Sequence, residues 1–202
     1  MNKKILGMAL AIGLMIPMTL SARAFDFNIG ATAQFQKDVN SVDFDSSDFI
    51  DINNYSFGAE TRLNFLLFEV ADTALLGTVE HIGSSRGSGV SFQNNLAAGI
   101  YKDILNNSLR IGLLAGPEFE MMINDTGVYN ADGSSFNFVD IFMKSNFTYK
   151  AHADILIGTG LTLSASYTLP TSFNLDQGNY INLMPVYSDW ENGRIGISLL
   201  LL

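Results

Sequence analysis

Hydrophobic and polar side chains alternate with a period of two over most of this chain. In the clearest run, 55–67, Phe57 and Leu63 share one face while Glu60 and Arg62 share the other. Because successive side chains of a β-strand point to opposite faces, strict alternation predicts strands. Eight such runs are present, at 25–35, 55–67, 74–81, 90–100, 109–119, 139–149, 155–169 and 195–201. No stretch carries a sustained 3.6-residue apolar stripe, so we expect no substantial helix after the first 24 residues.

The segments between these runs alternate in length. Three short connections lie at 69–73, 102–108 and 150–154, and four longer or more polar ones lie at 38–50, 83–89, 124–135 and 171–189. Short turns at one end and long loops at the other are typical of outer-membrane barrels, and most of the runs reach the ~9–11 residues that cross a bilayer. An even strand number places both termini at the short-turn end. The pattern leaves open whether 180–187 extends the last strand or belongs to the last loop.

The first 24 residues have the features of an export signal. A short basic head and an uncharged apolar stretch, 5–20, precede small residues at Ala22 and Ala24. Signal peptidase reads this arrangement. A membrane anchor is the alternative, which the short apolar core disfavours. We expect a cleaved signal peptide at 1–24 and one mature domain at 25–202.

Composition narrows the classes of protein that fit. Of the 202 residues, 48% are hydrophobic and 15% are charged, and there is no cysteine. Removal of the predicted signal leaves eight basic and 20 acidic residues, a net charge of −12, which argues against a nucleic-acid partner. Beyond the signal, no apolar run approaches the ~18 residues of a membrane helix. An apolar, exported chain without such a helix favours a barrel in the outer membrane.

The polar face of the predicted strands is rich in small residues and carries charges of both signs. An eight-stranded barrel is just wide enough for side chains to fill its interior. The charges would therefore form either a gate or a structural network that neutralises buried charge, and we favour the network because unpaired buried charges are costly. Parity assigns these charged residues to the lumen: Glu60, Arg62, Glu80, Arg110, Glu118, Glu120, Asp140, Lys144 and Arg194.

The signal segment, the eight alternating runs and the alternating connections resemble the small eight-stranded outer-membrane proteins of the OmpA, OmpX and OmpW type. The resemblance implies an all-β, antiparallel up-and-down transmembrane β-barrel in the outer membrane, in contact with lipopolysaccharide. Aromatic residues near the strand ends fit the two interfacial girdles of such barrels, with Phe147 and Tyr149 at the short-turn end. Two features depart from the pattern: the chain ends in leucines instead of an aromatic residue, and Pro117 interrupts a predicted strand, which suggests a bulge or a strand end.

The two histidines are the catalytic candidates to consider. His81 lies near Ser84, and lipid A-modifying barrel enzymes use serine and histidine. Glu80 cannot orient His81, however, because adjacent strand residues face opposite ways. His152 falls in a predicted short turn and is expected to be solvated. We therefore expect no enzymatic activity and no cofactor.

The first long connection is acidic. Asp43, Asp45 and Asp48 are weak candidates for a divalent-cation site, since carboxylate oxygens suit such ions. The spacing fails the calcium-loop pattern because Ser47 and Asp48 stand where that pattern needs a ligand and a glycine. We expect a solvated acidic loop and no metal.

The sequence thus predicts a non-enzymatic, monomeric outer-membrane barrel. Its expected role is structural or in surface contact through the long loops, or the restricted passage of small or apolar solutes through a narrow lumen. A soluble periplasmic barrel that binds an apolar ligand is the alternative from another class, and a lipid A-modifying enzyme is the third.

Overall fold

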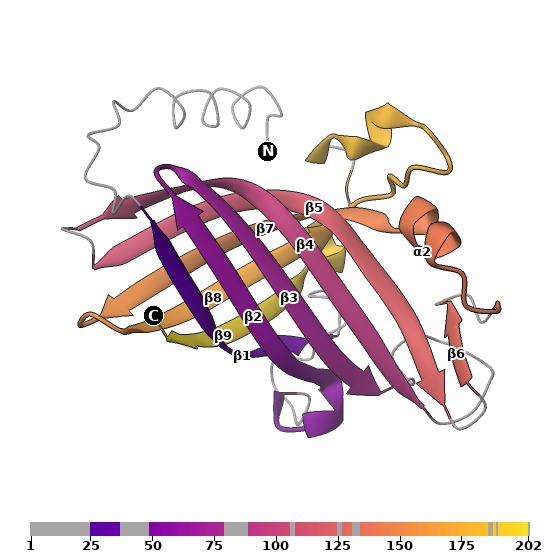
Figure 1. Ribbon diagram of the computed structural model, residues 1–202, viewed down its shortest axis with the longest axis horizontal. Helices are drawn as coiled ribbons and strands as arrows, with labels where there is room; N and C mark the ends of the chain where they lie inside the picture. The colour runs from indigo at the N-terminus through magenta and orange to yellow at the C-terminus, as the bar shows by residue number, and fades with distance from the viewer. Residues whose placement is uncertain are drawn as a thin grey trace.

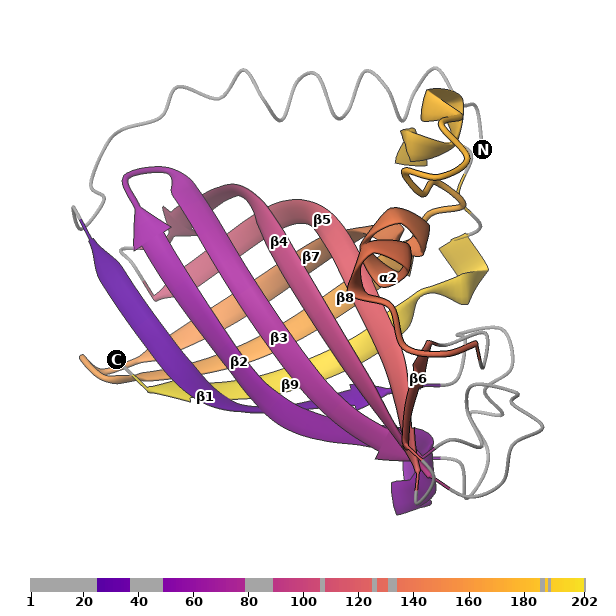
Figure 2. The same cartoon turned by 45° about the vertical axis from the view of Figure 1, so that its right-hand side comes forward.

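A computed structural model describes residues 25–36, 49–78, 89–105, 108–124, 127–130, 134–185, 188 and 190–201. Eight antiparallel strands close into a barrel through the pairing of β4 with β5. Figures 1 and 2 show the tilted strands wrapping around a common bore. The barrel strands are β1 (Asp26–Phe35), β2 (Tyr55–Phe65), β3 (Phe68–Thr78), β4 (Val90–Ile104), β5 (Leu109–Asn124), β7 (Asn146–Ile157), β8 (Leu161–Pro170) and β9 (Arg194–Leu201). The all-β, eight-stranded antiparallel barrel predicted from the alternation is confirmed.

Short turns gather at one end of the barrel, beside the start of β1 and the end of β9 (Figures 1 and 2). The other end carries the longer connections. Their described elements are a 3₁₀ turn η3 (Ile52–Asn54), the short strand β6 (Gly127–Asn130) on the edge of β5, helix α2 (Phe138–Lys144), and 3₁₀ turns η5 (Tyr180–Leu183) and η7 (Trp190–Asn192). The segment left open by the sequence is therefore loop over its described part.

On β2 the direction of the side chains follows the predicted parity. Phe57, Leu63 and Phe65 on β2 are 47%, 38% and 53% exposed on the outer wall, whereas Glu60 and Arg62 are 1% exposed in the bore. On the other strands most outward side chains are apolar and most inward ones are polar. β3 has the opposite parity to the one predicted for 74–81, because its even-numbered Leu76 is 52% exposed while odd-numbered Thr73 and Leu75 are buried. The barrel thus has a polar interior and an apolar exterior, the inverse of a soluble barrel.

The structure corrects the boundaries predicted for the region 139–169. The predicted strand at 139–149 begins as α2, whose Val139 amide donates to the Asn137 side chain. The predicted turn at 150–154 is the middle of β7, and the chain reverses only at 158–160, where Gly158 has a φ of 65°. Alternation does not reveal this three-residue turn, because the outward residues have odd numbers on both sides of it. Among the described residues, no helix is long and apolar enough to span a membrane.

The shift of β7 also moves the aromatic residues at its start. Phe147 and Tyr149 lie at the long-loop end, not at the short-turn end as predicted, because β7 begins at Asn146 beside the loops. The Tyr149 hydroxyl donates to the carbonyl of Leu183 in η5, and the Phe147 ring packs edge-on against Phe173. These rings fasten the last loop to the barrel.

The turn between β2 and β3 also differs from the prediction. The predicted connection 69–73 is strand, and the reversal occurs at Leu66 and Leu67, with Leu66 at a φ of 56°. Two leucines carry none of the glycine, proline or asparagine signals that mark turns. As a result β3 is a full strand of 11 residues that starts at Phe68.

Pro117 neither ends β5 nor produces a bulge. β5 continues to Asn124, and the proline pairs with Phe147 of β7. On the other side, the β4–β5 pairing pauses between Ala98↔Ala115 and Asn95↔Glu118 and resumes in the same register. The missing proline N–H therefore interrupts the ladder without shifting it.

Candidate functional site

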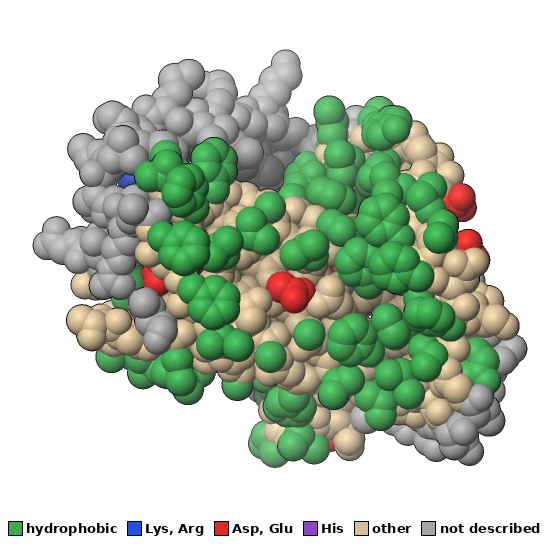
Figure 3. Space-filling model, viewed as in Figure 1, with side chains coloured by type: hydrophobic (Ala, Val, Ile, Leu, Met, Phe, Trp, Pro, Cys, Tyr) green, Lys and Arg blue, Asp and Glu red, His purple; other side chains and the backbone are tan. Residues whose placement is uncertain are grey.

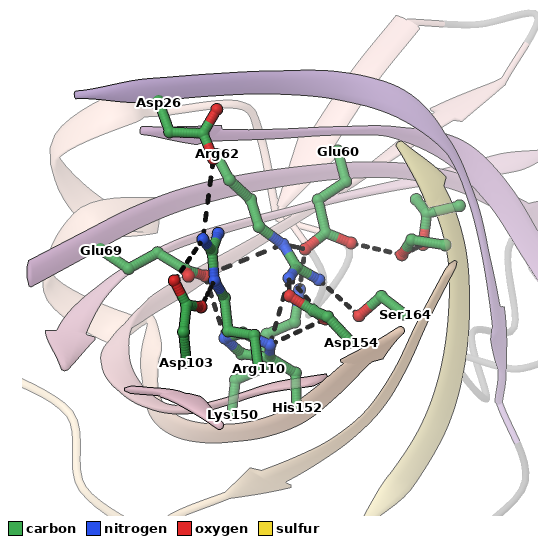
Figure 4. Close-up of polar contacts among 12 residues, drawn as sticks. Asp26, Glu60, Arg62, Glu69, Asp103, Arg110, Lys150, His152, Asp154 and Ser164 are labelled. Atoms are coloured by element: carbon green, nitrogen blue, oxygen red, sulfur yellow. Dashed lines mark hydrogen bonds and ion pairs between the residues drawn. The ribbon is translucent and has the colours of Figure 1, made fainter. Parts of the chain in front are cut away.

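A cluster of charged side chains fills the bore near mid-height (Figure 4). The strands β2, β3 and β7 supply its six members, which we call the bore cluster. All six side chains are at most 4% exposed. The bore cluster consists of Glu60, Arg62, Glu69, Lys150, His152 and Asp154.

Arg62 is the centre of the bore cluster. Its Nε lies 2.7 Å from Oε1 of Glu60, and its Nη1 lies 2.8 Å from Oδ2 of Asp154 across the bore. Its Nη2 donates to the Ser164 hydroxyl of β8 at 2.7 Å. Oε1 of Glu69 lies 3.8 Å from Nε. The planar guanidinium therefore ties together β2, β3, β7 and β8, which a point charge such as lysine could not do with the same geometry.

Glu60 joins a second set of strands. Its Oε1 accepts from Lys150 Nζ at 2.7 Å, and its Oε2 accepts from the Ser198 hydroxyl of β9. Ser198 lies 2.9 Å from the Thr32 hydroxyl of β1, and Lys150 also donates to Thr73 of β3. Glu60 and Lys150 thus both find partners on other strands, as a buried charge requires.

His152 sits between two carboxylates. Its Nε2 lies 3.0 Å from Oε1 of Glu69, and its Nδ1 lies 3.0 Å from Oδ1 of Asp154 and 3.1 Å from Nη1 of Arg62. The imidazole packs over Gly112, where a Cβ atom would meet Nε2 at 2.0 Å. The expectation of a solvated turn histidine was wrong, because residue 152 lies inside β7 with its side chain buried in the bore. Arg62 and Lys150 supply two positive charges to the three carboxylates of the bore cluster, and a proton on the imidazole would supply the third.

A second ion group lies toward the short-turn end. Nε of Arg110 is 2.6 Å from Oδ1 of Asp103, and its Nη2 is 3.7 Å from Oδ2 of Asp26 on β1. The guanidinium also stacks on the Tyr101 ring at 4.4 Å. The Asn64 amide, oriented to satisfy both neighbours, links Arg110 to Glu69 of the bore cluster. The two groups form one continuous network, to which all eight barrel strands contribute.

A third group lies toward the long-loop end. Nη2 of Arg194 pairs with Glu118 at 2.5 Å, and Gln93 Nε2 donates to Glu120 at 2.9 Å. Between this group and Lys150 the bore holds a cavity of about 10 Å³. That volume accommodates roughly one water molecule. Side chains therefore occupy the bore along the height of all three groups.

The mouth of the barrel at the long-loop end holds a larger cavity of about 200 Å³. Glu118 and Glu120 form its floor and α2 contributes Asp140 and Lys144 to its wall. Asp140 and Lys144 were predicted on a strand inside the lumen. That prediction was wrong, because residues 138–144 form a helix above the bore, where a period of two no longer describes the side-chain directions.

The structure places six of the nine predicted lumenal charges in the bore, in the pairs named above. They are Glu60, Arg62, Arg110, Glu118, Glu120 and Arg194. Glu80 lies outside the described residues, as do His81 and the acidic candidates Asp43, Asp45 and Asp48. Among the described residues, no group of three or more His, Cys, Asp or Glu side chains could hold a metal ion.

Sequence reasoning missed much of the network. Glu69, Lys150, His152 and Asp154 fall in predicted turns, although each is at most 4% exposed in the bore. A signal was present: Thr148, Lys150, His152 and Asp154 share one parity, which the polar residues of the following strand continue. Extending the alternation test across the predicted turn 150–154 would have found Lys150, His152 and Asp154.

No family model and no curated protein sequence matches this chain. The class of the protein therefore rests on its architecture, a closed eight-stranded barrel with an ion-paired bore and an apolar outer wall. Chemically this arrangement can neutralise charge, cross-link strands and obstruct the bore.

Proposed function

We propose that this protein is a non-enzymatic barrel of the outer membrane, with a structural role and a surface-contact role carried by its long loops. The apolar outer wall supports membrane insertion. Outward residues such as Ile29, Leu113 and Ile197 are 50%, 59% and 58% exposed, and such residues recur around the whole barrel. In water this wall would be an unusually large apolar patch, whereas lipid tails cover it at no cost. Closure also pairs the backbone groups, as the bilayer demands.

The proposed structural role rests on the bore cluster. Its ion pairs link strands across the lumen, and its members are almost completely buried. A pathway for solutes would require these pairs to separate inside a low-dielectric interior, where unpaired charges are costly. We therefore favour a closed barrel over the restricted passage of solutes.

The soluble alternative is disfavoured by the same geometry. A periplasmic barrel that binds an apolar ligand needs an apolar bore and a polar exterior. Here charged and other polar side chains line most of the bore, with a small apolar cluster of Ala71, Ala97 and Leu114. The outer wall carries Phe27, Phe57 and Leu63. Both surfaces have the wrong polarity for that function.

Cell fractionation with gel electrophoresis tests the proposal. We expect the protein in the outer-membrane fraction, with a folded form that migrates differently before and after boiling. Purified protein in planar bilayers should show no large, stable conductance steps. Recovery in osmotic-shock fluid would contradict membrane insertion, and stable nanosiemens steps from the monomer would contradict the closed bore.

A further inference from the structure

One acidic side chain interrupts the apolar outer wall. Asp72 lies in the middle of β3 and points outward between Val70 and Leu76, which are 41% and 52% exposed. Among the described strand residues it is the one exposed acidic residue. Figure 3 shows an acidic group surrounded by hydrophobic and uncharged side chains on the face formed by β2 to β5.

The outward residues around Asp72 are mostly small or polar, apart from Leu96 of β4, which pairs directly with Asp72 and is 45% exposed. Thr61 of β2 lies opposite Asp72, and Ala59 of β2 and Asn94 of β4 flank Ala74. Toward either end of the wall the side chains become large again, as in Phe57 and Leu63 on β2. We call these five residues the Asp72 patch: Ala59, Thr61, Asp72, Ala74 and Asn94.

The Asp72 patch satisfies only part of its own hydrogen-bonding capacity. Asn94 Nδ2 donates to Oδ1 of Asp72 at 2.7 Å. Within the described part of the chain, Oδ2 of Asp72 and the Thr61 hydroxyl have no further hydrogen bond. Lipid tails offer no partner, and a polar group left unsatisfied in hydrocarbon is strongly disfavoured. Direct contact between the Asp72 patch and lipid tails is therefore energetically unfavourable.

We propose that the Asp72 patch is the contact face between two copies of this chain in the membrane. The proposal rests on the membrane insertion proposed above and replaces the expectation of a monomer. In a dimer with a two-fold axis, the Asp72 patch of one copy contacts the Asp72 patch of the other. The patch is self-complementary, because the free oxygen of Asp72 can accept from the Asn94 amide or the Thr61 hydroxyl of the second copy.

The small side chains make this contact geometrically feasible. In membranes, association gains little from hydrophobicity and depends on close packing and polar contacts between spanning segments. Ala59 and Ala74 allow the two walls to approach until the polar groups are within hydrogen-bond reach. The larger Phe57, Leu76 and Leu96 would then pack around the contact and exclude lipid from it.

Cysteine cross-linking tests the contact, because the chain has no cysteine of its own. Ala74→Cys places one thiol at the centre of the patch. Ala165→Cys is the matched control: Ala165 is also an outward alanine, but it lies on β8, four strands away around the barrel of eight. Both variants are first recovered from outer membranes and checked for heat-modifiable migration. They are then treated there with a short bismaleimide.

We expect a band of twice the chain mass for Ala74→Cys and little or none for Ala165→Cys. Adding Asp72→Leu to the Ala74→Cys variant should lower the dimerisation constant about tenfold, the size expected for losing two symmetric polar contacts in a bilayer. Equal cross-linking of the two cysteine variants, a cross-linked product with a different protein, or no effect of Asp72→Leu would overturn the proposal. Failure to recover the protein in the outer membrane would instead overturn the proposed function, so the two failures are distinguishable.

Discussion

Removing the central cation of the bore cluster should destabilise the barrel strongly. Arg62 is 1% exposed and pairs with Glu60 at 2.7 Å and Asp154 at 2.8 Å. Arg62→Met keeps much of the length of the side chain but removes the guanidinium from both Glu60 and Asp154. Loss of one partner of a buried ion pair costs about 3–5 kcal/mol. Against a typical total of ~5–15 kcal/mol, such a loss should be plain in an unfolding curve.

The assay is equilibrium urea unfolding of the purified protein in lipid vesicles, followed by far-UV circular dichroism. Arg194→Met is the matched control, because Arg194 and Glu118 retain 11% and 14% side-chain exposure and water can replace part of their pairing. The double variant Arg62→Met/Asp154→Leu should be less destabilised than the sum of its single changes by roughly 0.5–3 kcal/mol, because it removes both charges. A cost below about 1 kcal/mol for Arg62→Met, or one equal to that of Arg194→Met, would refute the role given to buried pairing.

Two further changes test the bore and the outer wall by the same unfolding assay. Gly112→Ala places a Cβ atom 2.0 Å from Nε2 of His152 and should cost about 1–3 kcal/mol, whereas Gly160→Ala meets nothing within 4 Å and should be nearly neutral. Equal effects would show that the imidazole is not held against Gly112. Leu199→Arg on the outer wall, 49% exposed, should cost about 2–4 kcal/mol in vesicles, while Ile50→Arg in the long-loop end, 85% exposed, should cost little. A tolerated arginine at Leu199 would contradict contact with lipid.

The local alternation of apolar and polar residues was enough to predict the barrel architecture. Period-two alternation is a local property, since it depends only on successive side chains pointing to opposite faces. It predicted eight strands, the outward direction of Phe57 and Leu63, and the inward direction of Glu60 and Arg62. It misplaced turns where they kept the alternation in phase, at 158–160, or where leucines formed the reversal, at Leu66.

Only the tertiary structure decided which charges meet. Arg62 and Asp154 are 92 residues apart in sequence, and Lys150 and Glu60 are 90 apart. Parity shows that each side chain enters the bore, but not at what height or opposite which partner, because those depend on strand tilt and register around the closed barrel. The same closure placed His152 between two carboxylates and left Asp72 facing outward between Thr61 and Leu96. Direction is a property of each strand, whereas pairing is a property of the whole cylinder.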